Sequence, residues 1–128
     1  MKLLLDTHAL LWWLLDDPQL PATARQAIAA RETTVLVSAA SGWEVATKVR
    51  IGRLPEARML VGGLEAAVRR EGFAVLPVGL AHALAAGSLP GPHRDPFDRL
   101  LMAQARIEDA MLVTNDVAIR HYGLPILW

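Results

Sequence analysis

Four acidic residues stand where an apolar run ends or a helix begins. Asp6 directly follows one apolar run, and Asp116 follows another. Glu44 lies early in a predicted helix, and Asp98 opens a second helix behind Pro96. Two carboxylates about 4 Å apart repel by about 1 kcal/mol in water and by several in a protein cleft, so a cluster of them needs compensation. Protonation of one or two acids, helix dipoles, or a hard divalent cation such as Mg²⁺ or Mn²⁺ would supply it.

Each acid, taken singly, also has a purely structural explanation. Asp6 and Asp116 are good helix N-caps. Residues 41–44 match a capping box, and residues 95–98 read as an N-cap, a proline at the first helical position and an acid in the first turn. Capping and metal binding can coexist, so both interpretations stay open.

Short apolar runs alternate with stretches at helical spacing, and these elements must position the acids. The predicted strands are residues 2–5, 34–38, 73–78, 111–114 and 126–128. The predicted helices are residues 8–15, 22–30, 39–51, 59–71, 80–89, 97–108 and 117–122. Continuous apolar strands are typical of a parallel sheet covered on both faces, so we expect an α/β/α sandwich. Ligands of such sheets bind beyond the carboxyl ends of the strands, where the four acids fall.

The predicted helix over residues 59–71 contains two adjacent glycines. Gly62 and Gly63 interrupt the stretch 59–71, and each costs about 1 kcal/mol relative to alanine in a helix interior. We therefore expect this helix to be bent or split.

The composition favours one well-filled domain over residues 1–128. The chain is 53% hydrophobic, and 13 basic residues balance 13 acidic ones. Zero net charge argues against nucleic-acid binding by overall attraction but leaves room for a local basic groove. The absence of cysteine excludes disulfides, zinc–thiolate sites and thiol nucleophiles. The longest apolar run, residues 9–15, is too short to span a membrane, and a cytoplasmic location fits these features.

Three segments together carry a specific family resemblance: LLLDTHALLWWL, SAASGWEVATKVRIGRL and HRDPFDRLLMAQARIEDAMLVTND. They resemble the PIN-domain nucleases and, within them, the VapC-like toxins of bacterial toxin-antitoxin pairs. The resemblance covers nearly the whole chain. It implies a five-stranded parallel sheet in the order 3-2-1-4-5 and an acidic quartet made of Asp6, Glu44, Asp98 and Asp116. It also implies divalent-metal-dependent endoribonuclease activity, a homodimer, and inhibition by a cognate antitoxin that inserts a peptide near the site.

Within this quartet we expect Asp6 and Asp98 to bind Mg²⁺ or Mn²⁺ directly. Glu44 and Asp116 are expected to bind directly or through water and to orient the attacking water. Three hydroxyls are candidates for supporting hydrogen bonds, although each could equally satisfy backbone groups at a strand end. They belong to Thr7, Ser38 and Thr114.

Basic residues near the acids are candidates for contact with the RNA backbone. They are Lys48, Arg50, Arg53, Arg94 and Arg99. The alternative is that they form solvated helix faces, with Arg99 paired to a neighbouring acid.

The aromatic residues and histidines suggest structural roles first. Trp43 is expected in the core. Trp12 and Trp13 point about 100° apart on a helix, so we expect one of them to be exposed, either at the rim of the core or on a surface for a second copy or the antitoxin. His8 and His93 lie close to acids, but no histidine pair has the spacing of metal ligands, and ordinary helix-end or surface roles are favoured.

Two other functions stay open at this point. A degenerate PIN-like module would only bind a protein partner, and the complete acidic set argues against it. A PIN nuclease that acts on DNA or in RNA processing is the second, because the chemistry of these residues does not choose the sugar.

Overall fold

The sheet that the apolar runs predict is present as five parallel strands in the order β3-β2-β1-β4-β5. The computed structural model describes residues 1–128, and its strands are β1 (Lys2–Leu5), β2 (Thr34–Ser38), β3 (Ala74–Leu76), β4 (Met111–Val113) and β5 (Ile126–Leu127). The helices are α1 (Thr7–Leu14), α2 (Ala22–Ala29), α3 (Ala39–Arg50), α4 (Leu64–Arg70), α5 (Leu80–Ser88), α6 (Pro96–Ile107) and α7 (Val117–Arg120). The α/β class and the strand order are therefore confirmed.

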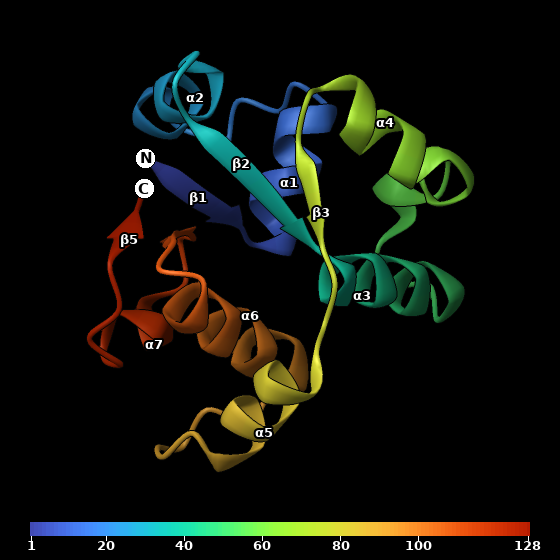
Figure 1. Cartoon of the computed structure of the whole chain (residues 1–128). Helices are drawn as coiled ribbons and strands as arrows, with labels where there is room; N and C mark the ends of the chain where they lie inside the picture. Colours follow the sequence, from blue (N-terminus) through green and yellow to red (C-terminus); the bar gives the residue numbers. More distant parts are fainter.

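The central strand β1 buries side chains on both faces of the sheet. Leu3 and Leu5 pack with side chains of α1, α2 and α4 on one face. Leu4 packs with side chains of α6 and α7 on the other. Figure 1 shows these two helical layers on opposite sides of the strands. Because side chains alternate across a strand, a strand covered on both faces needs a continuous apolar run, which is what the sequence shows.

The helix predicted over residues 59–71 is split, as the glycine pair suggested. Two 3-10 turns, η1 (Pro55–Ala57) and η2 (Val61–Gly63), precede α4, which begins at Leu64. The start at residue 59 is therefore wrong, because Gly62 and Gly63 lie in the second turn and do not continue a helix.

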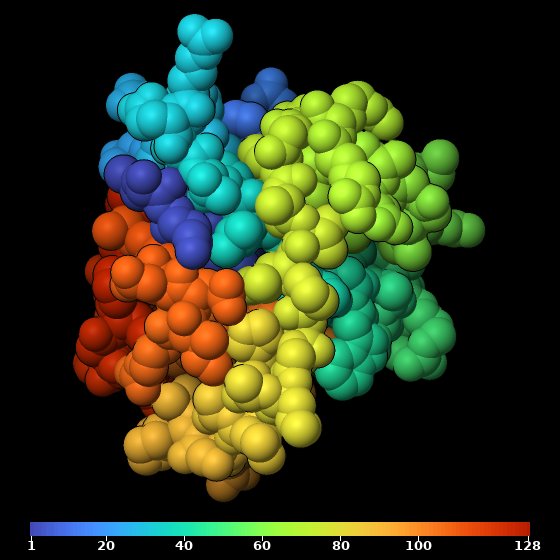
Figure 2. Space-filling model, viewed as in Figure 1, coloured from blue at the N-terminus to red at the C-terminus, as the bar shows by residue number.

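At the edge of the sheet, β3 is shorter than the run of residues 73–78. Its pairing with β2 ends where Leu76 lies opposite Ser38. Pro77, the next residue, has no N–H group to extend the ladder. The chain from β3 to α5 lies on the surface, where Figure 2 shows it in yellow. Three of the four acids follow strands at the centre of the sheet: Asp6 follows β1, Glu44 lies in the helix after β2, and Asp116 follows β4.

The tryptophans differ from expectation. Trp43 is 58% exposed and packs edge-to-face on Phe97 at 4.8 Å between ring centroids, so its expected place in the core is wrong. The α3 face that turns inward carries Glu44 and Val45 instead. Trp12 and Trp13 are both half-buried against the core, so the rim position considered for one of them describes both, and neither is fully exposed.

The carboxyl edge of the sheet collects three helix starts. Asp6 separates β1 from α1, and its N–H donates to the Val113 carbonyl at 3.0 Å, which extends the β1–β4 ladder. Ser38 ends β2 and caps α3, and Asp116 caps α7 just beyond β4. The longest helices have 12 residues each, and no helix has the length and hydropathy of a bilayer-spanning segment.

Candidate active site

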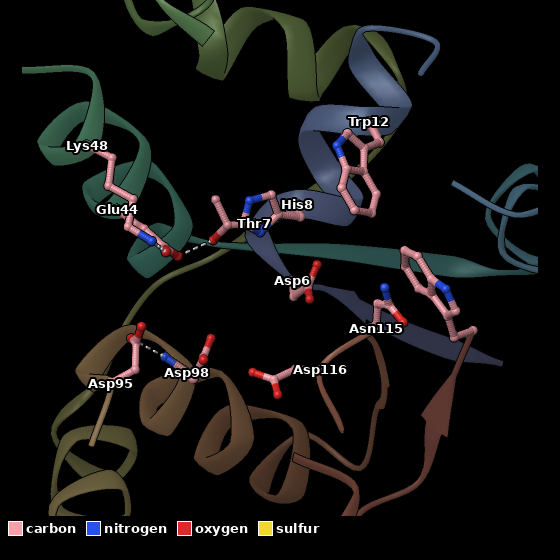
Figure 3. A pocket seen from close by; sticks show the side chains of 11 residues that line it. Asp6, Thr7, His8, Trp12, Glu44, Lys48, Asp95, Asp98, Asn115 and Asp116 are labelled. Carbon is pink, nitrogen blue, oxygen red and sulfur yellow. Dashed lines mark hydrogen bonds and ion pairs between the residues drawn. The ribbon is translucent and has the colours of Figure 1, made fainter. Parts of the chain in front are cut away.

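All four acids predicted from the sequence line one cavity of about 310 Å³. Figure 3 shows them approaching this cavity from α1, α3, α6 and the start of α7. The full lining is Asp6, Thr7, His8, Trp12, Glu44, Lys48, Asp95, Asp98, Asn115, Asp116 and Trp128. The cavity therefore contains five carboxylates and a single lysine.

Two of the acids are held by the caps that they form. Asp6 Oδ1 accepts a hydrogen bond from the N–H of Ala9 at 2.7 Å, at the start of α1. Asp116 Oδ1 accepts one from the N–H of Ala118 at 2.9 Å, at the start of α7. Each of these cap bonds engages one carboxylate oxygen. The capping explanation and a ligand role are therefore compatible, because a carboxylate has two oxygens and several lone pairs.

Asp98 lies in the first turn of α6, and Asp95 caps that turn. Asp95 Oδ1 accepts hydrogen bonds from the N–H groups of Phe97 (2.9 Å) and Asp98 (3.1 Å), and Pro96 occupies the first helical position. This is the arrangement predicted for residues 95–98. Because Asp95 caps α6, the side chain of Asp98 is left to face the cavity, where Figure 3 shows it opposite Asp6 and Asp116.

Glu44 is buried and is held by side chains, not by a capping box. The N-cap of α3 is Ser38, whose Oγ accepts from the N–H of Ala40 at 3.0 Å, so the capping box predicted at residues 41–44 is wrong. Glu44 Oε1 instead accepts from Thr7 Oγ1 at 2.5 Å, and Glu44 Oε2 forms an ion pair with Lys48 Nζ. A glutamate side chain that is only 6% exposed is thus fixed between a hydroxyl and an ammonium group.

Burial makes the negative charges of this cavity costly. It raises the pKa of Asp6, although the hydrogen bond from Ala9 opposes the shift. It also raises the pKa of Asp98 to about 6, against the hydrogen bond with His93, while the nearby negative charges add to the rise. Burial alone would lower the pKa of Lys48, but the hydrogen bond and the charge of Glu44 raise it. The site therefore favours the binding of positive charge.

The three predicted supporting hydroxyls have different contacts. Thr7 donates to Glu44, as described above. Thr114 is fully buried, its Oγ1 accepts from the N–H of Asp116 at 3.1 Å, and its hydroxyl opposes the rise in the pKa of Asp6. Ser38 caps α3 and donates to Gln104 Oε1 at 2.5 Å, so its contacts are with the helix framework.

Of the five basic candidates, only Lys48 lines the cavity. Three others are exposed outside the lining: Arg50, Arg53 and Arg94. Arg99 donates to the carbonyls of Ala86 (3.0 Å), Leu89 and His93 (2.8 Å) and so ties the loop before α6 to that helix. These bonds replace the pairing of Arg99 with a neighbouring acid considered from the sequence.

Sequence reasoning gave His93 an ordinary surface role, but it lies against Asp98. Its Nε2 is 2.9 Å from Asp98 Oδ2. The only local signal was its position five residues before Asp98, and the path of the intervening loop is not encoded in a residue pattern. An aromatic wall of Trp12, His8 and Trp128 was also missed; Trp12 lies 5.5 Å from the His8 ring and 5.7 Å from the Trp128 ring, between ring centroids.

The donor set fits a hard divalent cation. One ligand atom each from His93, Asp98 and Asp116 lies within 4.8 Å of the other two. Carboxylate oxygens predominate around the cavity, as Mg²⁺ and Mn²⁺ prefer. A cation there would also offset the cost of the buried charges on Asp6 and Asp98.

Solved structures share this fold at low sequence identity. VapBC2 from Rickettsia felis, bound to a DNA fragment from its promoter, is similar with a TM-score of 0.69 and 19% identity over 98% of this chain and 96% of that chain. FitAcB from Neisseria gonorrhoeae is similar with a TM-score of 0.67 and 18% identity over 97% and 95%. A toxin-antitoxin complex from Klebsiella pneumoniae has a TM-score of 0.56 and 18% identity over 88% and 85%.

At the level of sequence, no curated protein matches the chain. The family model of the PIN domain, however, matches residues 3–124, which takes in β2, β3, β4 and all of β1 except Lys2. The four acids lie within this match. The chain therefore belongs to the PIN-domain family of nucleases.

Proposed function

We propose that the protein is a Mg²⁺- or Mn²⁺-dependent endoribonuclease and the toxin of a toxin-antitoxin pair. The observation that carries the proposal is the convergence of Asp6, Glu44, Asp98 and Asp116 on one cavity at the carboxyl edge of the sheet. Buried carboxylates without enough nearby cations lower the free energy of unfolding. Binding of a divalent metal ion in a nuclease site would offset this cost and explain the cluster.

The residues divide between holding the ion and handling the attacking water. Asp6, Asp98 and Asp116 would hold the ion, with Glu44 as a further or water-mediated ligand. A bound divalent cation lowers the pKa of water and offsets charge on phosphoryl oxygens. Glu44 is kept in place by Thr7 and Lys48, so it can accept a hydrogen bond from the attacking water at a fixed position.

The walls of the cavity support a single-stranded nucleic acid as the substrate. The rings of Trp12, His8 and Trp128 form an aromatic surface beside the acids. Aromatic faces of this kind stack on unpaired bases. Lys48 is the one ammonium group in the lining and is placed to contact a backbone phosphate next to the scissile bond.

The role as a toxin draws on the solved neighbours. Three of them are the VapBC2, FitAcB and Klebsiella complexes described above, and the Klebsiella structure is a toxin-antitoxin complex. By analogy we propose a cognate antitoxin as the inhibitor of this chain, a homodimer as its assembly, and the cytoplasm, where its RNA would be found, as its location.

Cleavage assays with purified, antitoxin-free protein test the activity. We expect cleavage of single-stranded RNA with Mg²⁺ or Mn²⁺, no cleavage with a chelator, and loss of cleavage in Asp6→Asn with an unchanged circular dichroism spectrum. Asp109→Asn, which changes an exposed aspartate outside the cavity, is the matched control and should cleave normally.

Two results would redirect the proposal. Preferential cleavage of DNA in a competition between the two polymers would replace the ribonuclease by a deoxyribonuclease. Folded wild-type protein that cleaves neither polymer with any divalent cation would favour a module that only binds a partner. Growth arrest on expression, relieved by a neighbouring small open reading frame, tests the role as a toxin.

A further inference from the structure

We propose that His93 is a nitrogen ligand of the metal centre, so that an imidazole joins the carboxylates of Asp98 and Asp116 around the ion. This inference rests on the proposed metal dependence and goes beyond the acidic quartet. Its consequence is a preference for Mn²⁺ over Mg²⁺, because Mg²⁺ binds oxygen ligands almost exclusively whereas Mn²⁺, a first-row transition metal, also accepts an imidazole nitrogen beside carboxylates.

The spacing of the donor atoms supports this assignment. His93 Nε2 lies 2.9 Å from Asp98 Oδ2, and one ligand atom each from His93, Asp98 and Asp116 lies within 4.8 Å of the others. Around an ion with bonds of about 2.1 Å, neighbouring octahedral ligands lie about 3 Å apart and opposite ones about 4.2 Å apart. The three side chains are thus close to the separations that one shared ion requires.

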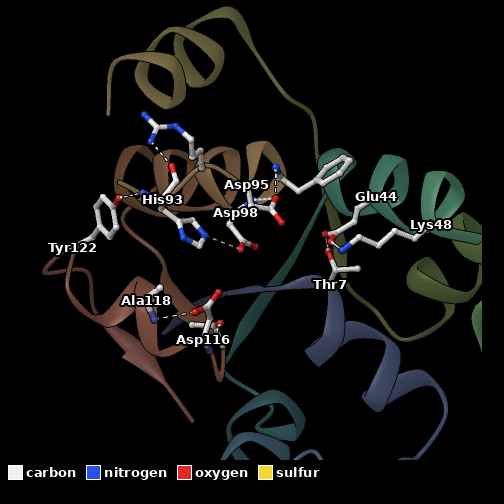
Figure 4. A network of polar contacts seen from close by, with 12 residues as sticks. Thr7, Glu44, Lys48, His93, Asp95, Asp98, Asp116, Ala118 and Tyr122 are labelled. Atoms are coloured by element: carbon white, nitrogen blue, oxygen red, sulfur yellow. Dashed lines mark hydrogen bonds and ion pairs between the residues drawn. The ribbon is translucent and has the colours of Figure 1, made fainter. Parts of the chain in front are cut away.

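The backbone around His93 is held from both sides. Its N–H donates to Tyr122 Oη at 3.0 Å, and its carbonyl accepts from Arg99 Nη1 at 2.8 Å. The imidazole also packs edge-to-face on the Tyr122 ring, at 6.5 Å between centroids. Figure 4 shows the imidazole directed toward Asp98, with Tyr122 on the other side of His93. These anchors come from α6 and from the segment after α7, so the position of His93 is set by the tertiary fold.

The approach of the loop to Tyr122 depends on one glycine. Gly91 has φ of +111°, and a Cβ atom added there would lie 2.5 Å from Tyr122 Oη. Only glycine fits both this backbone conformation and this close approach. Gly91 therefore lets the loop pass close to Tyr122, whose hydroxyl accepts from the N–H of His93.

The alternative is that His93 only orients Asp98 through a hydrogen bond. Electron spin-echo envelope modulation of bound Mn²⁺ separates the two roles, because a directly bound imidazole gives ¹⁴N modulation and a hydrogen-bonded neighbour of a ligand gives far weaker coupling. We expect ¹⁴N modulation in the wild-type protein and its loss in His93→Gln, which retains a side chain able to donate to Asp98.

The same substitution at other histidines tests whether the nitrogen bound to Mn²⁺ belongs to His93. His121→Gln changes an exposed histidine outside the cavity and should keep the modulation, and so should His8→Gln, although His8 lines the cavity. Calorimetry should show that His93→Gln weakens Mn²⁺ binding by about tenfold or more. The same substitution should change Mg²⁺ binding much less. If His93→Gln does not fold, wild-type protein labelled with [¹⁵N]histidine replaces it, and the ¹⁴N pattern should change to that of ¹⁵N.

The outcomes distinguish this inference from the proposed function. Bound Mn²⁺ without nitrogen modulation in the wild type would overturn the role of His93 and leave the acidic metal site intact. Modulation that persists in His93→Gln would also overturn it. Absence of any Mn²⁺ or Mg²⁺ binding would overturn both the inference and the proposed metal dependence.

Discussion

Replacing Asp98 by asparagine should stabilise the metal-free protein while it removes a metal ligand. Burial raises the pKa of Asp98 to about 6, from 3.8 for an ordinary aspartate. The folded state therefore binds more protons than the unfolded state between these values, and the free energy of unfolding falls as the pH rises through this window. Each tenfold change in the acid dissociation constant corresponds to about 1.4 kcal/mol, so the charge of Asp98 costs up to about 3 kcal/mol above pH 6.

Urea unfolding in the presence of a chelator measures this cost. At pH 8 we expect Asp98→Asn to exceed the wild type in unfolding free energy by up to about 3 kcal/mol. Near pH 4 most of the difference should disappear, because the wild-type carboxyl is then protonated in the folded state and partly protonated in the unfolded state. Asp109→Asn, at an exposed position, should show neither effect.

Added metal should reverse the order of stability. At a concentration 1,000 times its dissociation constant, an ion that binds only the folded state adds about 4.1 kcal/mol, which exceeds the cost of the buried charge. We expect this gain for the wild type and little of it for Asp98→Asn. If Asp98→Asn is no more stable than the wild type at pH 8 without metal, or is more stable by the same amount at pH 4, the argument from burial of the charge is wrong.

Three further substitutions test the buried Ser38–Gln104 hydrogen bond, the aromatic wall of the cavity and the loop before α6. Gln104→Leu removes the partner of the buried Ser38 hydroxyl and should lower the unfolding free energy by about 2 kcal/mol in urea. Trp12→Leu should weaken binding of a non-hydrolysable single-stranded RNA by about tenfold in fluorescence anisotropy, because stacking on one base is lost. Gly91→Ala combines a strained φ with a clash against Tyr122, and it should lower the unfolding free energy by about 2 kcal/mol and weaken Mn²⁺ binding.

Each of these results has an opposite that would count against the structure. A neutral Gln104→Leu would mean that the hydroxyl finds another partner. Unchanged RNA affinity in Trp12→Leu would remove the aromatic wall from the substrate path. Normal stability and normal Mn²⁺ affinity in Gly91→Ala would show that the loop before α6 does not need its observed conformation.

The central part of the fold was predictable because its signals are local. The limits of β1 and β2 agree with their apolar runs, since central parallel strands are buried on both faces and must be apolar throughout. The convergence of Asp6 and Asp116 followed from topology, because residues after parallel strands meet at one edge. The pairing of Glu44 with Lys48 could also have been predicted from their spacing of four residues on a helix.

The sequence did not predict contacts that depend on a choice between two possible N-caps, on the orientation of a helix, or on the path of a loop. Ser41 and Glu44 match a capping box, but Ser38 at the end of β2 takes the N-cap, and this choice depends on where the strand ends. Trp43 has a large apolar side chain of the kind found in cores. The orientation of α3 that buries Glu44, however, leaves Trp43 exposed. The contact of His93 with Asp98 depends on a loop whose anchors lie elsewhere in the chain.

Calorimetric titration of Mn²⁺ into metal-free protein is the most direct test of the acidic cavity as one cation-binding centre. Saturable binding to the wild type and to Asp109→Asn is expected, with binding strongly weakened by Asp6→Asn and by Asp98→Asn. Asp6 caps α1 and Asp98 lies in α6, so a shared ion explains why both substitutions weaken binding. Equal Mn²⁺ affinity in all four proteins, or no binding to any of them, would contradict the account.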